Sequence, residues 1–293
     1  HVDQVRMSKR LVTIMRDLDI ELDLEALTVH DPDAEALRDI FLDFEFRTLA
    51  DKYAKEAHGE AATENAATRE TDRTLVLHAE TIPGIAAAAR EEGAFALYSV
   101  VEGDVLRGRV TGVALAVAGD TPRSWYLPFD HRPPGGELTL DLGDAPEEAI
   151  PNFTRGWSHE ALAPLLDLLG DPGVTLVTHD LKRELLQLAR TGFVPGADAR
   201  DVMIASYVLD PGRRSHGLDE LAMEVLVHRA VPADDVRGKG RKRVPFAEVE
   251  LDAAAAWACE RAECALRLHH LFEAQLAEEE LAELYVDLEL PLV

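Results

Sequence analysis

The residues of this sequence best suited to chemistry are a histidine pair, a cationic segment and two cysteines. No G-x-G-x-x-G, G-x-S-x-G or H-E-x-x-H pattern accompanies them. His269 and His270 occupy adjacent positions in a predicted helix, where neighbouring side chains diverge rather than converge on a metal. We therefore expect each to be an ordinary buried or solvated histidine.

The cationic segment runs from residue 237 to residue 243 and holds two glycines and five basic residues: Arg237, Lys239, Arg241, Lys242 and Arg243. One interpretation is a flexible loop that contacts phosphates. The other is a solvated surface loop that offsets nearby acidic residues. The residues alone do not choose between the two, so we treat all five as candidate phosphate contacts.

The two cysteines, Cys259 and Cys264, lie five residues apart in a predicted helix. Five residues rotate a helix by about 140°, so the thiols point to different faces and cannot bridge. Because no C-x-x-C or Cys/His cluster is present, we expect no zinc site. We expect two small buried side chains in a reducing compartment.

Several elements must position these residues. Residues 1–50 have a segmented helical pattern, with a second helix starting at the cap formed by Asp31, Pro32 and Asp33. Residues 51–73 contain almost nothing apolar beyond alanine and Tyr53, which predicts a flexible linker. Residues 130–152 are punctuated by Pro and Gly and predict a surface excursion.

The remaining segments alternate between strand and helix patterns before becoming mostly helical. The strand candidates are residues 74–78, 94–101, 109–119, 123–129 and 174–180. The predicted helices cover 82–93, ending at Gly93; 158–171, capped by Ser158; 180–192, ending at Gly192; and 201–210, 216–226 and 251–284. This order predicts an α/β domain with a mixed sheet and covering helices.

Composition limits the function classes. The chain has 293 residues, 47% hydrophobic and 29% charged, which is enough for a sizeable core, and no apolar run long enough to span a bilayer. Asp and Glu number 55 against 30 Lys and Arg, and this net charge of −25 opposes broad nucleic-acid affinity. With lysine scarce among the basic residues, the excess acid also fits adaptation to high salt. Without a signal-peptide core we expect a cytoplasmic protein, and the abrupt ends suggest a piece of a longer chain.

Five segments, taken in order, carry a resemblance to a known family. They read SWYLPFDH (124–131), HDLKRELLQLARTG (179–192), ARDVMIASYVLDPGRRSHGLDELA (199–222), RGKGRKRVPFAEVELDAAAAWACERAECALRLH (237–269) and LYVDLELPLV (284–293). Together they resemble the proofreading, or 3′–5′ exonuclease, domain of the bacterial DNA polymerase I family (family A). Residues 1–50 resemble the tail of that family's 5′ nuclease domain.

The resemblance implies a ribonuclease H-like 3′–5′ exonuclease fold, α/β in class, with a mixed sheet flanked by helices and an N-terminal helical extension. It divides the chain into a 5′ nuclease tail (1–50), a linker (51–73), an exonuclease-like domain (74–290) and the start of a polymerase domain (291–293). The implied partners are DNA, bound weakly by this fragment, and the adjoining nuclease and polymerase domains. We expect a monomer with no membrane contact.

The family's chemistry is hydrolysis with two divalent cations, Mg²⁺ or Mn²⁺, held by about four carboxylates. By the resemblance, those positions fall on Tyr98, Val100, Glu184 and Arg261, so a carboxylate remains only at Glu184. Arg261 places a permanent cation where a metal would bind. We therefore expect no catalytic residues and no bound metal or other cofactor. We expect Arg261 to pair with Glu184 while Tyr98 and Val100 fill the pocket with apolar surface.

The leading hypothesis is thus a non-catalytic structural domain within a DNA polymerase that serves replication or repair. One alternative is an active exonuclease that uses displaced carboxylates, for which Glu102, Asp104, Glu260 and Glu263 are the candidates. Another is a stand-alone module that binds nucleic acid through the cationic segment.

Overall fold

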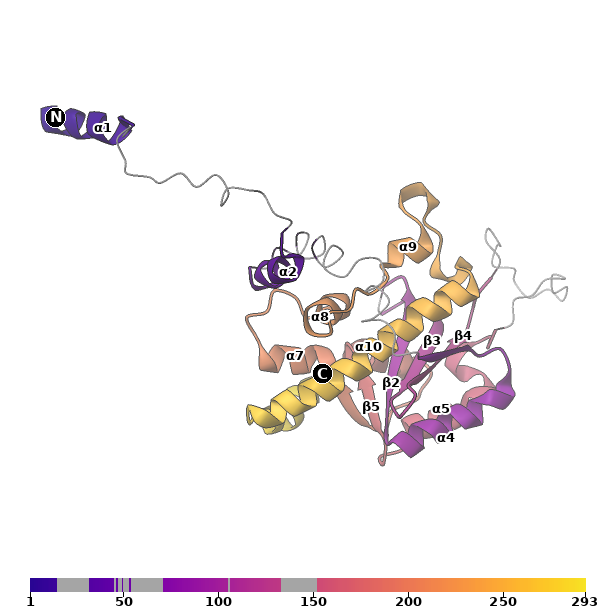
Figure 1. Cartoon of the computed structure of the whole chain (residues 1–293). Helices are drawn as coiled ribbons and strands as arrows, with labels where there is room; N and C mark the ends of the chain where they lie inside the picture. The colour runs from indigo at the N-terminus through magenta and orange to yellow at the C-terminus, as the bar shows by residue number, and fades with distance from the viewer. Residues whose placement is uncertain are drawn as a thin grey trace. The chain divides into compact units, whose positions relative to one another are not determined.

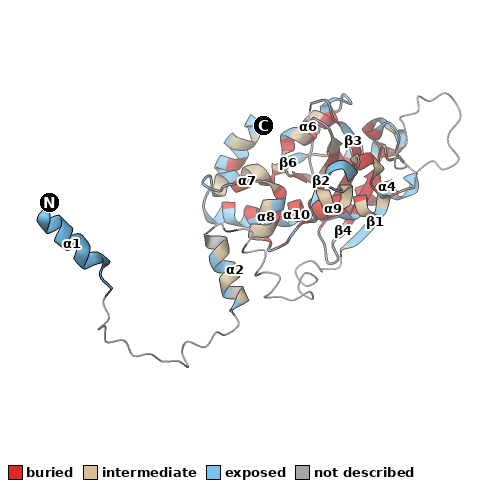
Figure 2. Ribbon diagram, turned by 90° about the horizontal axis from the view of Figure 1, so that it is seen from above, coloured by how far each residue is buried: buried red, intermediate tan, exposed pale blue. Residues whose placement is uncertain are grey.

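The computed structural model describes residues 1–14, 32–44, 46, 49, 53, 71–104, 106–132 and 152–293. The chain divides into two compact units, His1–Gly59 and Glu60–Val293. In the first unit, α1 (Val2–Val12) has no buried residue, and it is coloured as exposed along its length in Figure 2. The helix α2 (Ala34–Asp43) begins where the sequence predicts, because the Asp33 carboxylate accepts a hydrogen bond from the Ala36 N–H at 3.0 Å.

The second unit is built on a six-stranded mixed sheet (Figure 1). Its order is β1-β4-β3-β2-β5-β6, where β2 pairs antiparallel with β3 and β3 with β4. The pairs β1–β4, β2–β5 and β5–β6 are parallel. The strands are β1 (Asp72–Leu75), β2 (Ala94–Glu102), β3 (Arg109–Val117), β4 (Arg123–Pro128), β5 (Thr175–Thr178) and β6 (Asp198–Asp201). The mixed α/β class predicted from the sequence is confirmed.

Helices cover both faces of this sheet, because alternate residues of its central strands are apolar on each side. On one face, Ala96 and Val100 of β2 pack in one core with α10 (Leu251–Glu278) and α8 (Leu218–Val225). On the other face, Phe95 and Leu97 pack in a second core with α4 (Ile82–Glu92) and α5 (Ala163–Leu169). Figure 1 shows α10 crossing the sheet on the side opposite α4 and α5.

The remaining elements are short. Three more α-helices are α6 (Leu181–Ala189), α7 (Val202–Leu209) and α9 (Ala233–Arg237), and a π-helix covers Leu284–Glu289. Single 3₁₀ turns cover Ala79–Thr81, Gly156–Ser158, Glu160–Leu162, Gly240–Lys242, Phe246–Glu248 and Leu290–Leu292. None of the helices in the described part of the chain combines the length and the hydropathy that a bilayer span requires.

Some of the local sequence signals predict the structure correctly, and others do not. Gly93 ends α4 in the left-handed region, at φ 73°, as the sequence indicates. The predicted cap at Ser158 is wrong: the His159 ring accepts from the Ala161 N–H at 3.2 Å and begins a 3₁₀ turn, and α5 starts only at Ala163. The strand β6 was not predicted. Both cysteines are buried and free, as expected.

The boundaries of the predicted linker and excursion are only partly visible. The strand β1 starts at Asp72, so the last two residues of the predicted linker, Asp72 and Arg73, belong to the sheet. Apart from Tyr53 and residues 71–73, the linker lies outside the described residues. The predicted excursion at 130–152 also lies mostly outside them, since positions 133–151 are not described.

Candidate functional site

The four positions that the resemblance assigns to metal binding lie on three elements. Tyr98 and Val100 project from β2 toward α10, Glu184 lies in the first turn of α6, and Arg261 lies in the middle of α10. Glu184 reaches β2, where its Oε1 accepts from the Ser99 N–H at 3.1 Å. The fold therefore brings a carboxylate to the central strand, as the resemblance implies.

Glu184 is paired within its own helix. Its side chain is 1% exposed, and its Oε1 lies 2.9 Å from the guanidinium of Arg183. That guanidinium also lies over the Tyr98 ring, 4.8 Å from its centroid. Burial lowers the pKa of Arg183, but Glu184 and Tyr98 together outweigh this effect and raise it above its usual value. The other oxygen, Oε2, is buried and has no hydrogen-bond partner among the described residues.

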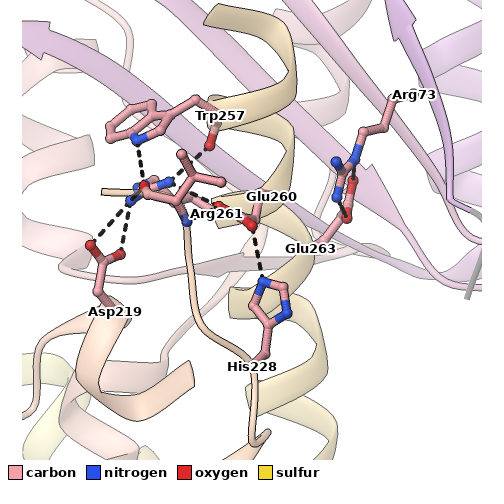
Figure 3. Close-up of polar contacts among 8 residues, drawn as sticks. Arg73, Asp219, His228, Trp257, Glu260, Arg261 and Glu263 are labelled. Carbon is pink, nitrogen blue, oxygen red and sulfur yellow. Dashed lines mark hydrogen bonds and ion pairs between the residues drawn. The ribbon is translucent and has the colours of Figure 1, made fainter. Parts of the chain in front are cut away.

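Arg261 makes a separate network, drawn in Figure 3. Its side chain is 3% exposed, and its Nη2 donates to both carboxylate oxygens of Asp219 at 3.1 Å. Nη2 also donates to the Val231 carbonyl at 2.9 Å, and Nη1 to the Trp257 carbonyl at 3.1 Å. The guanidinium stacks on the Trp257 ring at 3.7 Å. These contacts orient the guanidinium toward α8 and toward Val231.

The predicted pairing of Arg261 with Glu184 is wrong. The ion pairs of Arg261 run to Asp219 and Glu260, and Glu184 is held by Arg183 instead. The physical reason is that the nearest cation to Glu184 comes from the preceding residue of its own helix. Arg261 instead pairs with Asp219 of α8, which lies on the same side of the sheet as α10.

Glu260 extends the network. Its Oε1 lies 3.0 Å from His228 Nε2, and its Oε2 accepts from the Val231 N–H at 2.8 Å (Figure 3). Burial raises the pKa of this carboxyl, but the hydrogen bonds from His228 and Val231 and the charge of Arg261 leave it below its usual value. The network therefore ties the segment 228–231 to the middle of α10.

Tyr98 and Val100 contribute apolar contact. Val100 is buried, and the partly buried Tyr98 packs against the same core, with its ring 5.9 Å from that of Trp257 in an edge-on arrangement. This agrees with the expectation that the two side chains fill the pocket with apolar surface.

The carboxylates proposed as substitutes have other partners. Glu102 pairs with Arg237 at 2.7 Å, and Glu263 makes a two-bonded pair with Arg73 at 2.6 and 2.8 Å (Figure 3). Asp104 accepts from the Leu106 N–H at 2.8 Å inside a turn. Glu260 belongs to the Arg261 network. These four side chains make their contacts in different places rather than around Glu184.

A pair of divalent cations needs about four carboxylates with free oxygens. The four motif positions supply one, Glu184, and one of its two oxygens is taken by Ser99 and Arg183. A second position holds the guanidinium of Arg261, which would repel a metal. The residues present at these positions do not fit a two-metal centre.

The cationic segment divides into anchored and free residues. Arg237 is half-buried, since it pairs with Glu102 and donates to the Val244 carbonyl at 3.0 Å. Lys239 lies 3.4 Å from Asp235, and Arg243 lies 3.8 Å from Asp234. Arg241 and Lys242, at the tip, are exposed and form no ion pair within the described residues.

A third group was missed by the sequence reasoning. His269, His270 and Glu273 place one ligand atom each within 4.8 Å of one another, and the two imidazole centroids lie 5.4 Å apart. The expected divergence of the adjacent histidines is therefore wrong. The signal that would have found the group is Glu273, four residues after one histidine and three after the other, on the same helical face.

Comparisons with known proteins relate the chain to a family. Residues 140–277 match the family model described as a 3′–5′ exonuclease. The chain is 29% identical over 298 residues to a DNA polymerase I of Pseudomonas aeruginosa, covering 99% of this chain and 31% of that protein. It is 34% identical over 197 residues to a DNA polymerase I of Rhizobium leguminosarum, covering 65% of this chain and 18% of that protein. The chain thus spans less than a third of these relatives.

Solved structures show the same fold. The POL domain of Pol1 from M. smegmatis, in complex with DNA primer-template and dNTP, matches with a TM-score of 0.51 and 21% identity, covering 74% of this chain and 30% of that one. The Trypanosoma brucei RNase D complex with RNA U12 matches with a TM-score of 0.50 and 14% identity, covering 71% and 65%. The predicted exonuclease-type α/β fold is confirmed.

Proposed function

Because this chain carries a 3′–5′ exonuclease domain of the kind found in bacterial DNA polymerase I, we propose that it is a fragment of such a polymerase, acting in the cytoplasm in DNA replication and repair. Its exonuclease-type domain, residues 74–290, is catalytically silent. It serves as a structural domain between a nuclease part, whose tail is 1–50, and a polymerase part that starts near 291.

The observation that carries this proposal is the environment of Arg261. A buried guanidinium, stacked on Trp257 and bonded to Asp219, stands where the family motif has a metal-binding carboxylate. At about 5 Å, a guanidinium and a divalent cation repel each other by roughly 7 kcal/mol at an effective dielectric of about 20. The hydrogen bonds and stacking that satisfy Arg261 also oppose any movement of its side chain away from this position.

DNA remains the proposed ligand, bound weakly and through phosphates. The exposed charges of Arg241 and Lys242 support this, because the two side chains form no ion pair within the described residues. The net charge of −25 opposes any stronger affinity by this fragment alone.

The test is a nuclease assay on the chain with 5′-labelled single-stranded DNA and Mg²⁺ or Mn²⁺. We expect no metal-dependent trimming. Trimming that disappears in Glu184→Gln would overturn the proposal and favour an exonuclease that uses displaced carboxylates. Trimming that persists in Glu184→Gln would point to a contaminating nuclease, and purification would then be repeated until the Glu184→Gln baseline is clean.

A gain-of-function variant provides the matched comparison. Tyr98→Asp, Val100→Glu and Arg261→Asp together restore the motif carboxylates beside Glu184. We expect this variant to regain metal binding only weakly, because the packing of Trp257 and Asp219 around Arg261 is adapted to the larger side chain.

A further inference from the structure

The group His269, His270 and Glu273 lies in the C-terminal half of α10, outside the network around Arg261. With a rise of about 1.5 Å per residue, His269 is about 12 Å along the helix axis from Arg261. None of the three residues contributes to the motif positions or to the cationic segment. The group is therefore independent of the exonuclease proposal.

Its geometry is that of a ligand set on one rigid helix. Glu273 follows His269 by four residues and His270 by three, and both spacings bring side chains together on a helix surface. His269 Nε2 lies 3.7 Å from Glu273 Oε2, and the two imidazole rings are tilted by 46° with centroids 5.4 Å apart. The three ligand atoms lie within 4.8 Å of one another.

His269 has no competing partner. Its residue is 7% exposed, yet its imidazole has no hydrogen bond to any described residue. Its ring nitrogens are not among the fully buried polar atoms without a partner, so they keep some access to solvent. His270 and Glu273 are exposed, so both can change rotamer to close the distances to those of a coordinated ion.

The charges around the group favour a cation as well. Arg200, whose charge reaches His269, is offset by its own ion pair with Asp198 at 2.5 Å. Glu273 supplies a negative charge directly beside the ring.

We propose that His269, His270 and Glu273 form a transition-metal site on the surface of α10, with two imidazoles and one carboxylate as ligands. This ligand set suits Zn²⁺, whose open sites commonly use three protein ligands of these types plus water. Imidazole does not suit Mg²⁺, which prefers oxygen ligands, so the site is chemically distinct from a two-metal exonuclease centre.

The test is titration of the chain with Zn²⁺ against a chromophoric chelator, followed by the same titration on three variants. We expect one ion bound per chain in the micromolar range. His270→Gln and Glu273→Gln should each weaken binding by about tenfold or more, since each removes one of three ligands. The matched control is His78→Gln, a histidine outside the group, which should leave the affinity unchanged.

Two further measurements keep the result interpretable. Co²⁺ in place of Zn²⁺ should give the visible absorption of a nitrogen- and oxygen-ligated ion, and this band should vanish in the His270→Gln, Glu273→Gln double variant. Both substitutions are at exposed positions, so the variants should remain folded by circular dichroism. Binding that is equally tight in the folded double variant, or that appears only at millimolar Zn²⁺, would overturn the proposal.

Discussion

Arg261 of α10 donates to both carboxylate oxygens of Asp219 on α8, at 3.1 Å each. The arginine side chain is 3% exposed and the aspartate side chain 50%, so the pair joins a buried cation to a half-solvated anion. Together with the stacking on Trp257, this contact holds α8 against the helix that crosses the sheet. The position that the resemblance assigns to metal binding is thus a point of helix packing in this structure.

The first prediction concerns the stability that this contact provides. Arg261→Ala should lower the free energy of unfolding by about 3 kcal/mol, because it leaves the buried Glu260 without its cation and a gap beside Trp257. Asp219→Asn should cost about 1 kcal/mol, since that side chain is half exposed. Urea unfolding measures both. Arg267→Ala, at an exposed position of the same helix, is the control and should change little. Equal effects of Arg261→Ala and Arg267→Ala would contradict the assigned role.

The second prediction concerns pH. The folded state holds the pKa of Glu260 below its usual value of 4.5, so folding favours the charged form. The stability that Glu260 contributes is then fully present above pH 4.5 and is lost as pH falls through its lower folded-state pKa. The difference in unfolding free energy between the parent chain and Glu260→Gln should shrink over that acidic range. The control is Glu278→Gln, an exposed carboxylate on α10. A difference that is independent of pH would show that Glu260 acts through packing alone.

The third prediction distinguishes the exposed tip of the cationic segment from the flanking residues that are paired with acids. Arg241→Ala with Lys242→Ala should weaken single-stranded DNA binding and reduce the slope of log K against log salt by about 1.4, or about 0.7 for each phosphate that is no longer neutralised. Lys239→Ala with Arg243→Ala removes the same formal charge, but these residues are paired with Asp235 and Asp234, so the slope should change less. Fluorescence anisotropy at several salt concentrations measures both. Identical slopes for the two double variants would mean that the segment responds only to its net charge.

The fourth prediction concerns the π-helix near the C-terminal end of the chain. The Tyr285 hydroxyl accepts from the Asp201 N–H at 2.8 Å and donates to the Asp201 carbonyl at 3.0 Å. Tyr285→Phe should cost about 1–3 kcal/mol, because it leaves the backbone N–H of buried Asp201 without its partner. Hydrogen exchange at the Asp201 amide should accelerate in the variant. Tyr207→Phe, at an exposed tyrosine, is the control, and unchanged exchange in Tyr285→Phe would refute the assigned hydrogen bond.

The sequence predicted most elements of the fold whose signals are local. Gly93 ends α4 because a residue without a side chain enters the left-handed region easily, and that signal needs no knowledge of the rest of the chain. The strand β6 was missed because Asp198–Asp201 reads Asp-Ala-Arg-Asp, with no apolar alternation. Its extended form comes from parallel pairing with β5, which only the assembled sheet provides.

The same distinction between local signals and long-range contacts applies to the candidate site. The family resemblance implies that Glu184 lies near Tyr98 and Val100, and the structure has Glu184 bonded to Ser99 of β2, because a family motif carries information about the whole fold. The partner of Arg261 was mistaken because Asp219 is 42 residues away, and nothing local reveals how α8 rotates against α10. The two neighbouring histidines do not by themselves indicate the histidine group, because its third member, Glu273, lies one turn later on the helix.

Glu102 binds the chain on both sides of the tip of the cationic segment. Its Oε1 pairs with Arg237 before the tip, and its Oε2 accepts from the Phe246 N–H after it. The exposed tip between these anchors is rich in the residues after which trypsin cleaves. After a single cleavage there, the chain on each side of the cut would still be bound to Glu102 of β2. The long helix α10 would remain packed on the sheet. Limited digestion should therefore yield a nicked molecule whose two fragments elute together and separate only in denaturant.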